Sequence, residues 1–111
     1  MTDQPIPYTS DTPRDIERLA AAGDAVLLDV REQDEWNVGH LKHAQLLCLS
    51  SIQAMTSADQ TGLPSGKPIY THCKAGVRSV LAAGFLRQFG FDCRPLQQGF
   101  EELTAEGLET V

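Results

Sequence analysis

One cysteine of this chain lies where an apolar strand-like run gives way to a helix-like run, between two cations. The segment is YTHCKAGVRSVLAAGFLRQFG, in which Cys73 is followed by Lys74 and then by Arg78. A glycine-containing loop that opens a helix can turn several backbone N–H groups inward and so bind an anion. A thiolate is an anion, so the same geometry predicts a lowered pKa for Cys73. We expect Cys73 to be a nucleophile toward an anionic substrate.

Such a loop can supply the free energy needed to lower the pKa of a thiol. Lowering a thiol pKa from about 8.5 to near 6 requires about 3 kcal/mol. A helix N-terminus supplies up to about 2 kcal/mol in a partly buried site, and N–H hydrogen bonds with the Arg78 charge supply the remainder. The formal net charge of −6 does not oppose this, because charges beyond about 8 Å are largely screened.

Composition limits the class of protein. A chain of 111 residues with 41% hydrophobic content predicts a single domain over 1–111. The three cysteines show no paired spacing, which favours a reducing compartment. No signal peptide is evident and no apolar run approaches the roughly 18 residues of a membrane span. We expect a soluble cytoplasmic protein without a membrane partner. The negative charge disfavours nucleic acid as a partner, and with no paired ligand motif we expect neither a metal nor a cofactor.

Strand-like and helix-like segments alternate along the chain, which predicts a parallel α/β sheet whose sites lie at the carboxyl ends of its strands. Strands are predicted over 25–30, 44–49, 68–72 and, at an edge, 92–96; helices over 11–23, 31–38, 50–55, 80–90 and 100–106. Residues 56–68 are predicted to form a surface loop, and 1–10 a loosely ordered segment or a first short strand. Cys73 follows the third strand directly.

Helix signals and apolar spacing give finer predictions. Asp11 or Thr12 is expected to cap the first helix, and Gly23 to end it. Ser50 or Ser51 is expected to cap the third helix. The buried stripes are predicted to be Ile16, Leu19 and Ala20 in the first helix, and Val77, Val80, Leu81, Phe85 and Phe89 in the fourth. Cys48 and Cys93 are expected to be packed inertly inside strands.

Three motifs resemble those of the rhodanese family of sulfurtransferases in its single-domain form. The resemblance runs from about Ile16 to Gly107 and rests on Asp29-Val30-Arg31-Glu32, Glu35-Trp36-x-x-Gly39-His40 and Cys73-x-x-Gly76-x-Arg78-Ser79. It implies a rhodanese-like α/β fold, a mostly parallel five-stranded sheet flanked by helices on both faces. It also implies that the loop cysteine carries sulfane sulfur as a persulfide.

The resemblance implies roles residue by residue. Cys73 becomes the persulfide carrier, and the cradle around the bound anion is completed by Lys74, Ala75, Gly76, Val77 and Arg78, mainly through backbone N–H groups. The Lys74 and Arg78 side chains are expected to face the anionic end of the donor. Asp29, Arg31 and Glu32 are expected to tie the strand end to neighbouring loops, with Arg31 at the pocket mouth.

Several positions depart from the family pattern or have ordinary structural interpretations. The departures are Leu41-Lys42-His43-Ala44, Gln98-Gly99 and Leu103, which bear on the shape of the pocket rim. Trp36 is expected in the core, and His40 is expected to satisfy a local hydrogen bond. His72 is expected to bond to backbone, although its place before Cys73 leaves a tuning role open.

Three function classes follow. The first is a thiosulfate sulfurtransferase, in which Cys73 takes sulfur from thiosulfate or a persulfide and passes it to a thiol, cyanide or a protein by a two-step scheme. The second is a phosphatase or arsenate reductase, although the four residues between Cys73 and Arg78 are one fewer than in those loops. The third is a binding or sulfur-relay module with little turnover of its own.

Overall fold

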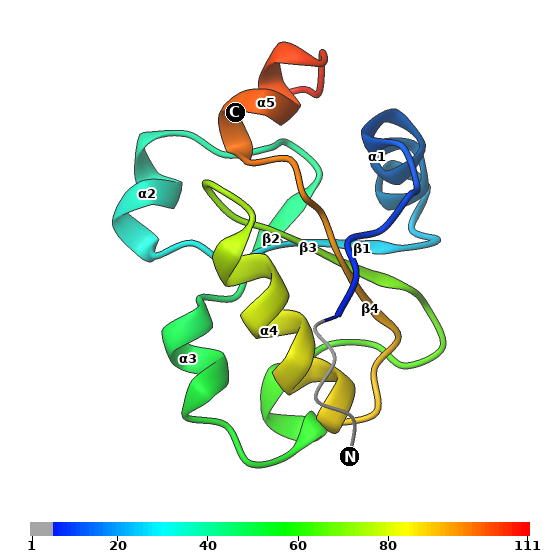
Figure 1. Cartoon of the computed structure of the whole chain (residues 1–111), viewed down its shortest axis with the longest axis vertical. Coiled ribbons are helices and arrows are strands. Elements are labelled where there is room, and N and C mark those ends of the chain that lie inside the picture. The colour runs from blue at the N-terminus through cyan, green and yellow to red at the C-terminus, as the bar shows by residue number, and fades with distance from the viewer. Residues whose placement is uncertain (1–5) are drawn as a thin grey trace.

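The structure is a computed structural model that describes residues 6–111. One parallel sheet is formed by β1 (Val26–Asp29), β2 (Ala44–Leu46), β3 (Ile69–His72) and β4 (Cys93–Pro95), in the order β2-β1-β3-β4 (Figure 1). β1 and β3 are the central strands and pair in register from Val26 opposite Ile69 to Asp29 opposite His72. Their carboxyl ends therefore open at the same edge of the sheet, next to Cys73.

The sheet has four strands within the described residues, so the expectation of five is wrong for 6–111. Residues 6–10 form no strand, because Thr9 donates a single backbone hydrogen bond to the Pro95 carbonyl, at 2.8 Å, and no ladder continues from it. Residues 1–5, on which the alternative of a first short strand partly falls, lie outside the described residues. β4 is an edge strand, as its proline predicts.

Helices cover both faces of the sheet, as predicted (Figure 1). The α-helices are α1 (Pro13–Ala22), α2 (Gln33–Val38), α3 (Leu49–Gln53), α4 (Val77–Gln88) and α5 (Phe100–Ala105), with a 3₁₀ turn η1 (Ala58–Thr61) in the predicted loop. α1 begins where Thr12 Oγ1 accepts the Asp15 N–H, at 3.3 Å, and ends at Gly23 in the left-handed conformation. The predicted limits of this first helix are confirmed.

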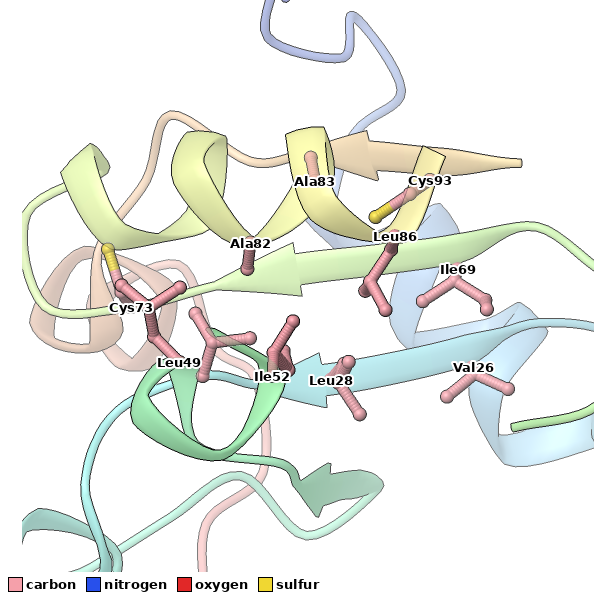
Figure 2. Packing of buried hydrophobic residues seen from close by; sticks show 11 residues of the cluster. Val26, Leu28, Leu49, Ile52, Ile69, Cys73, Ala82, Ala83, Leu86 and Cys93 are labelled. Carbon is pink, nitrogen blue, oxygen red and sulfur yellow. The ribbon is translucent and has the colours of Figure 1, made fainter. Parts of the chain in front are cut away.

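Strand side chains alternate between two apolar layers. Val26 and Leu28 face the layer under α3 and α4, which Figure 2 shows from close by. Leu27 faces the opposite layer, where it meets Ile16 of α1 and Leu103 of α5. Because burial on both faces removes apolar surface from water along the whole strand, the near-continuous apolar run of β1 is the sequence signature of this placement.

The buried stripe of α4 differs from the prediction. Ser79, Ala82, Ala83 and Leu86 are buried, whereas Val77 is 65% exposed and Leu81 50% exposed. The buried positions keep the helical spacing i, i+3, i+4, i+7, but small side chains occupy it because α4 packs directly over β3 and β4 (Figure 2). Phe85 and Phe89 flank this stripe and are partly buried against the same layer.

The boundary between β2 and α3 also differs. β2 ends at Leu46, and α3 begins at Leu49 with Cys48 as its N-cap. The backbone N–H groups of Leu47 and Leu49 donate to the carbonyls of Asp29 and Val30, at 2.9 and 3.0 Å, so the chain leaves the sheet there. Cys48 is therefore half-buried at a helix start and not inside a strand, and neither predicted serine caps the helix.

Candidate active site

Cys73 lies at the carboxyl end of β3, and the loop after it leads into α4 at Val77. The Gly76 N–H turns back and donates to Cys73 Sγ, at 3.1 Å. Gly76 has a φ of +83°, and a Cβ there would lie 2.8 Å from the Gln97 carbonyl oxygen. Both the conformation and the space require glycine, so this residue is what allows the loop to aim an N–H group at the sulfur.

The thiol of Cys73 is 1% exposed. Burial raises its pKa, but hydrogen bonding by the backbone groups of Ser79, Ala75 and Gly76 outweighs burial, and the pKa of Cys73 is lowered overall. The predicted direction is confirmed, and its leading source is the preorganised backbone rather than the neighbouring cations. Backbone donors at a helix start are fixed before the charge forms, so they stabilise a thiolate without being reordered.

The loop is held by the segment that follows β4. The Phe100 N–H donates to the Cys73 carbonyl, at 2.9 Å. Gly99 packs so closely that a Cβ there would lie 1.7 Å from the Lys74 carbonyl oxygen. Ser79 Oγ donates to the Leu96 carbonyl, at 3.1 Å. The segment 96–100 therefore fixes the loop from outside the sheet.

A second support comes from the N-terminal segment. The Tyr8 hydroxyl donates to the Gly76 carbonyl, at 2.9 Å, across 68 positions of sequence. The side chain of Tyr8 is 42% exposed, so its hydroxyl reaches the loop from the surface. Sequence patterns gave no sign of this contact, because it joins a segment predicted to be loosely ordered to a loop far along the chain.

Arg78 is paired with Glu35 of α2. Its Nη1 and Nη2 donate to the two Glu35 carboxylate oxygens, at 2.6 and 2.9 Å. The hydrogen bonds from Arg78 lower the pKa of Glu35 to about 2. The Arg78 guanidinium is therefore engaged by a carboxylate and links α4 to α2, whereas sequence reasoning expected it to face the donor.

Arg31 joins three parts of the site. Its guanidinium donates to the buried Asp29 carboxylate at 2.8 to 3.0 Å and to the Gly39 carbonyl at 2.8 Å. It also lies 4.3 Å from the centre of the Phe100 ring, within range of a cation–π contact. The structural role expected of Asp29 and Arg31 is confirmed, and Arg31 also reaches the surface hollow beside the loop.

That hollow, here called the Lys74 hollow, has a volume of about 310 Å³ and is lined by Arg31, Glu35, Val38, Gly39, Lys74, Phe100 and Glu101. Lys74 and Arg31 both line this hollow, whereas Val38, Phe100 and Glu101 were not identified from the sequence. A second hollow, of about 290 Å³, includes Pro68 and Asp92 at the amino ends of β3 and β4, away from Cys73.

His72 is fully buried, and neither of its ring nitrogens has a hydrogen-bond partner within residues 6–111. The expected bond to backbone is therefore wrong. Nε2 lies 3.8 Å from an Asp29 carboxylate oxygen, but that carboxylate already accepts from Arg31. Burial lowers the pKa of His72 to about 4, so the ring is neutral near neutral pH.

Two other motif residues lie at the margin of the site. Trp36 is half-buried rather than in the core and stacks on His40, with ring centres 3.6 Å apart. His40 Nδ1 lies 3.0 Å from the Trp36 carbonyl oxygen, which confirms the expected local hydrogen bond. This stack ends α2 next to Gly39, whose carbonyl accepts from Arg31.

The departures from the family pattern divide into two kinds. Leu41 and Leu103 are buried in the layer beneath α1 and α5, and Leu41 bridges to Thr110. Lys42 pairs with Glu109 at the surface, at 3.2 Å. Gly99, the glycine that is kept in the altered late motif, packs against the Cys73 loop.

No three His, Cys, Asp or Glu side chains of residues 6–111 gather closely enough to hold a metal ion. None of the helices described for this range has the length and apolar character required to cross a membrane.

Comparison with known proteins agrees with the fold. The family model of the rhodanese-like domain matches residues 12–106 of this chain. The chain is 34% identical over 90 residues to the probable adenylyltransferase/sulfurtransferase MoeZ of Mycobacterium tuberculosis, covering 79% of this chain and 22% of MoeZ. It is 30% identical over 92 residues to the Rickettsia prowazekii protein RP600, covering 75% of each.

A solved structure gives the same result for the fold. The crystal structure of a rhodanese-related protein from Thermoplasma volcanium superposes with a TM-score of 0.75 at 25% identity, covering 94% of this chain and 98% of that one. The chain spans about a fifth of the length of MoeZ, so the two proteins correspond over one domain only. With its parallel sheet, its cysteine loop and a family match over most of its length, the chain belongs to the rhodanese-like domain family.

Proposed function

We propose that this protein is a sulfurtransferase that carries sulfane sulfur as a persulfide on Cys73. The sulfur comes from thiosulfate or an organic persulfide and passes to a thiol, cyanide or a protein acceptor. The observation that carries the proposal is the Cys73 sulfur itself, buried at a strand end with a lowered pKa and a backbone N–H donated to it. Membership of the family, and relatives with sulfurtransferase in their names, support it.

The reaction needs two displacements at sulfur. The Cys73 thiolate attacks the outer sulfur of thiosulfate; the Sγ–S bond forms as the donor's S–S bond breaks, and sulfite leaves with the bonding electron pair. Cys73 then carries S–S⁻. An acceptor such as cyanide attacks the terminal sulfur, thiocyanate leaves, and the Cys73 thiolate is restored. Neither step requires an outside oxidant or reductant.

The loop residues have distinct proposed roles. The backbone of Lys74, Ala75, Gly76, Val77 and Arg78 forms the cradle, with the Gly76 N–H already on the sulfur. The Lys74 side chain, at the surface of the Lys74 hollow, binds the body of the donor, and Arg31 forms the inner wall. Because the Cys73 thiol is 1% exposed, the atom that reaches it must project from the donor, as a terminal sulfane sulfur does.

The phosphatase or arsenate reductase alternative is less well supported. A tetrahedral oxyanion needs a wide cradle and an arginine free to bind it. The present loop has only four residues between Cys73 and Arg78, and both guanidinium Nη atoms bond to Glu35. A non-catalytic module is disfavoured because Cys73 is present with a lowered pKa.

The test is the intact mass of the protein after treatment with thiosulfate or with cysteine persulfide. We expect the wild type to gain one sulfur atom, mapped to Cys73, and to lose it to cyanide with formation of thiocyanate. Cys73→Ser is expected to gain none. Retained thiocyanate production by Cys73→Ser, above the uncatalysed rate, would contradict the proposed nucleophile.

The other two thiols provide matched controls. Cys48→Ala and Cys93→Ala should each keep turnover within a few-fold of wild type, because neither thiol lies in the loop. Loss of turnover in folded Cys93→Ala would indicate a resolving cysteine and redox chemistry instead. All three cysteines are free thiols, which supports a reducing, cytoplasmic compartment as part of the proposal.

A further inference from the structure

Half of the charged side chains that line the Lys74 hollow are already paired. Its wall contains the charged residues Arg31, Glu35, Lys74 and Glu101. Arg31 is bonded to the buried Asp29 carboxylate, at 2.8 Å, and Glu35 is bonded to Arg78, at 2.6 Å. Each of these pairs has no net charge, so neither adds positive potential to the hollow.

The two remaining wall charges are opposite in sign. Lys74 and Glu101 are exposed, and neither forms an ion pair within the described residues 6–111. Their charges cancel. The other charged residues of α2 and α5 are Asp34 and Glu102, both acidic. The side chains around the hollow therefore carry no excess of positive charge, and the whole chain carries −6.

The rest of the wall is apolar and wide. Val38 is 92% exposed, and the Phe100 ring lies under the Arg31 guanidinium. A volume of about 310 Å³ corresponds to roughly ten water molecules by their share of the liquid. A leaving group as small as sulfite would fill little of this space, whereas an organic group would contact both the ring and the valine.

This inference rests on the proposed function. We infer that the site favours an organic persulfide, R–S–SH, over the thiosulfate dianion, and that the organic group R of this donor is neutral or zwitterionic and so has no net charge. The Cys73 thiolate attacks the terminal sulfur of R–S–SH. The Sγ–S bond forms, the donor's S–S bond breaks, and the thiol sulfur leaves with the electron pair and takes up the proton. The products are Cys73–S–S⁻ and R–SH, so charge and protons balance.

The first measurement is the rate constant for loading of Cys73, followed by quenching and intact mass, with thiosulfate as the probe at low and at high ionic strength. A site that attracts dianions loses rate steeply as salt rises. The wild type is expected to show a thiosulfate rate that is flat or rises with salt, because the wall side chains have no net positive charge to screen and the overall charge is repulsive. Cysteine persulfide, whose organic part is zwitterionic, is the comparison donor.

The second measurement uses charge variants, since the two donors differ in intrinsic reactivity and their rates alone do not decide. Glu101→Gln should raise the thiosulfate loading rate by about two- to fivefold, the scale of one exposed charge, without raising that of cysteine persulfide. Asp24→Asn is the matched control: it removes the same charge from an exposed turn before β1, at the opposite edge of the sheet, and should change neither rate.

The results of these measurements distinguish failure of the donor preference from failure of the sulfurtransferase proposal. A thiosulfate rate that falls steeply with salt, or a Glu101→Gln variant that matches Asp24→Asn, would overturn the inference and leave the sulfurtransferase proposal standing. Failure of both donors to load Cys73 would overturn both. Folding of each variant is checked by circular dichroism, and Glu101→Lys should extend the gain with thiosulfate in the same direction.

Discussion

Cys73 and Cys93 belong to the same apolar layer and are both buried, yet their ionisation differs in direction. Figure 2 shows Cys73 beside the first turn of α4 and Cys93 near Leu86, toward the other end of the same helix. Burial raises the pKa of Cys93 to about 12. Burial also opposes ionisation of Cys73, but backbone donors at the helix start outweigh it and the pKa is lowered.

The difference shows that depth alone does not make a cysteine inert or reactive. Both thiols are desolvated, and desolvation disfavours a thiolate wherever it occurs. What differs is the number of N–H groups that converge on the sulfur, which depends on a loop and a helix N-terminus at the carboxyl end of a parallel strand. Cys93 lies at the start of β4 and has no such loop.

The largest expected effect comes from crowding the Cys73 loop. Gly99→Ala would place a methyl group 1.7 Å from the Lys74 carbonyl oxygen, so the loop must move and its N–H groups lose their aim at Cys73. We expect the rate of sulfur loading of Cys73 to fall by at least about a hundredfold, because misplaced catalytic groups reduce rates on this scale. The pKa of Cys93 should not change. The measurement is the rate of loading followed by intact mass.

Gly84→Ala is the control for this variant. A Cβ at Gly84 lies 3.8 Å from its nearest neighbour, and alanine favours a helix interior by about 0.5–1 kcal/mol over glycine. Gly84→Ala should therefore keep full activity. Equal loading rates in Gly99→Ala and Gly84→Ala would show that sulfur loading of Cys73 does not depend on the present position of the loop.

The next prediction compares a residue that supports the loop, Arg78, with one that attracts the donor, Lys74. Arg78→Ala should lower kcat/KM by more than tenfold with either donor, because it removes the link from α4 to α2. Lys74→Ala should mainly raise the thiosulfate KM, by tenfold or less, on the scale of one exposed charge contact. Steady-state kinetics on both variants gives the ranking.

Glu35→Gln sharpens the same comparison. If Arg78 acts as a strut, freeing its guanidinium should reduce activity toward both donors. An increase in thiosulfate activity in Glu35→Gln, or a larger loss in Lys74→Ala than in Arg78→Ala, would contradict this ranking and make donor capture by a cation dominant.

His72 extends the comparison to a buried base whose ring nitrogens form no hydrogen bond within residues 6–111. Its pKa is lowered to about 4 by burial, while an unfolded histidine titrates near 6.5. As pH falls from about 6.5 to 4 the unfolded state gains a proton that the folded state does not, so the free energy of unfolding falls, by about 2–3 kcal/mol. Chemical denaturation across this pH range should show the decline in wild type and a smaller one in His72→Phe.

This window is separate from that of the carboxylate pair. The pKa of Glu35 is lowered to about 2, so its stabilisation is complete above its ordinary pKa near 4.5 and is lost as pH falls toward 2. An equal decline between pH 6.5 and 4 in wild type and His72→Phe would show that another group accounts for it.

The smallest effect concerns the N-terminal support. Tyr8→Phe removes only the hydroxyl that donates to the Gly76 carbonyl. We expect a loss of a few-fold in Cys73 reactivity with iodoacetamide, on the scale of one partly exposed hydrogen bond, and no change in fold. Tyr70→Phe removes a hydroxyl bonded to Asp11, outside the loop, and should leave the rate unchanged. Equal rates for all three proteins would remove Tyr8 from the positioning of the loop.

Local signals in the sequence were enough to predict the order of the four described strands and five α-helices, the cap at Thr12 and the place of Cys73 after β3. These features depend on neighbours within a few residues, such as a cap and a stop glycine. The direction of the Cys73 pKa was predictable for the same reason, since its donors lie in the loop and in the first turn of α4 that follow it.

Contacts between distant segments were not predictable. The pairing of Arg78 with Glu35 spans 43 positions and that of Tyr8 with Gly76 spans 68. The buried face of α4 was misassigned because close packing selected Ala82 and Ala83 over the larger apolar residues beside them. The lack of a hydrogen bond to the His72 ring within residues 6–111 likewise depends on where β1 and Arg31 place Asp29.

The central claim is most directly tested by the rate of alkylation of Cys73 against pH, measured with iodoacetamide and resolved from Cys93 by peptide mass. We predict an apparent pKa for Cys73 below the ordinary thiol value of about 8.5, because backbone donors stabilise its thiolate. Cys93 should remain unreactive over the same range, since its pKa is about 12. An apparent pKa for Cys73 at or above about 8.5, or a reactive Cys93, would contradict the account.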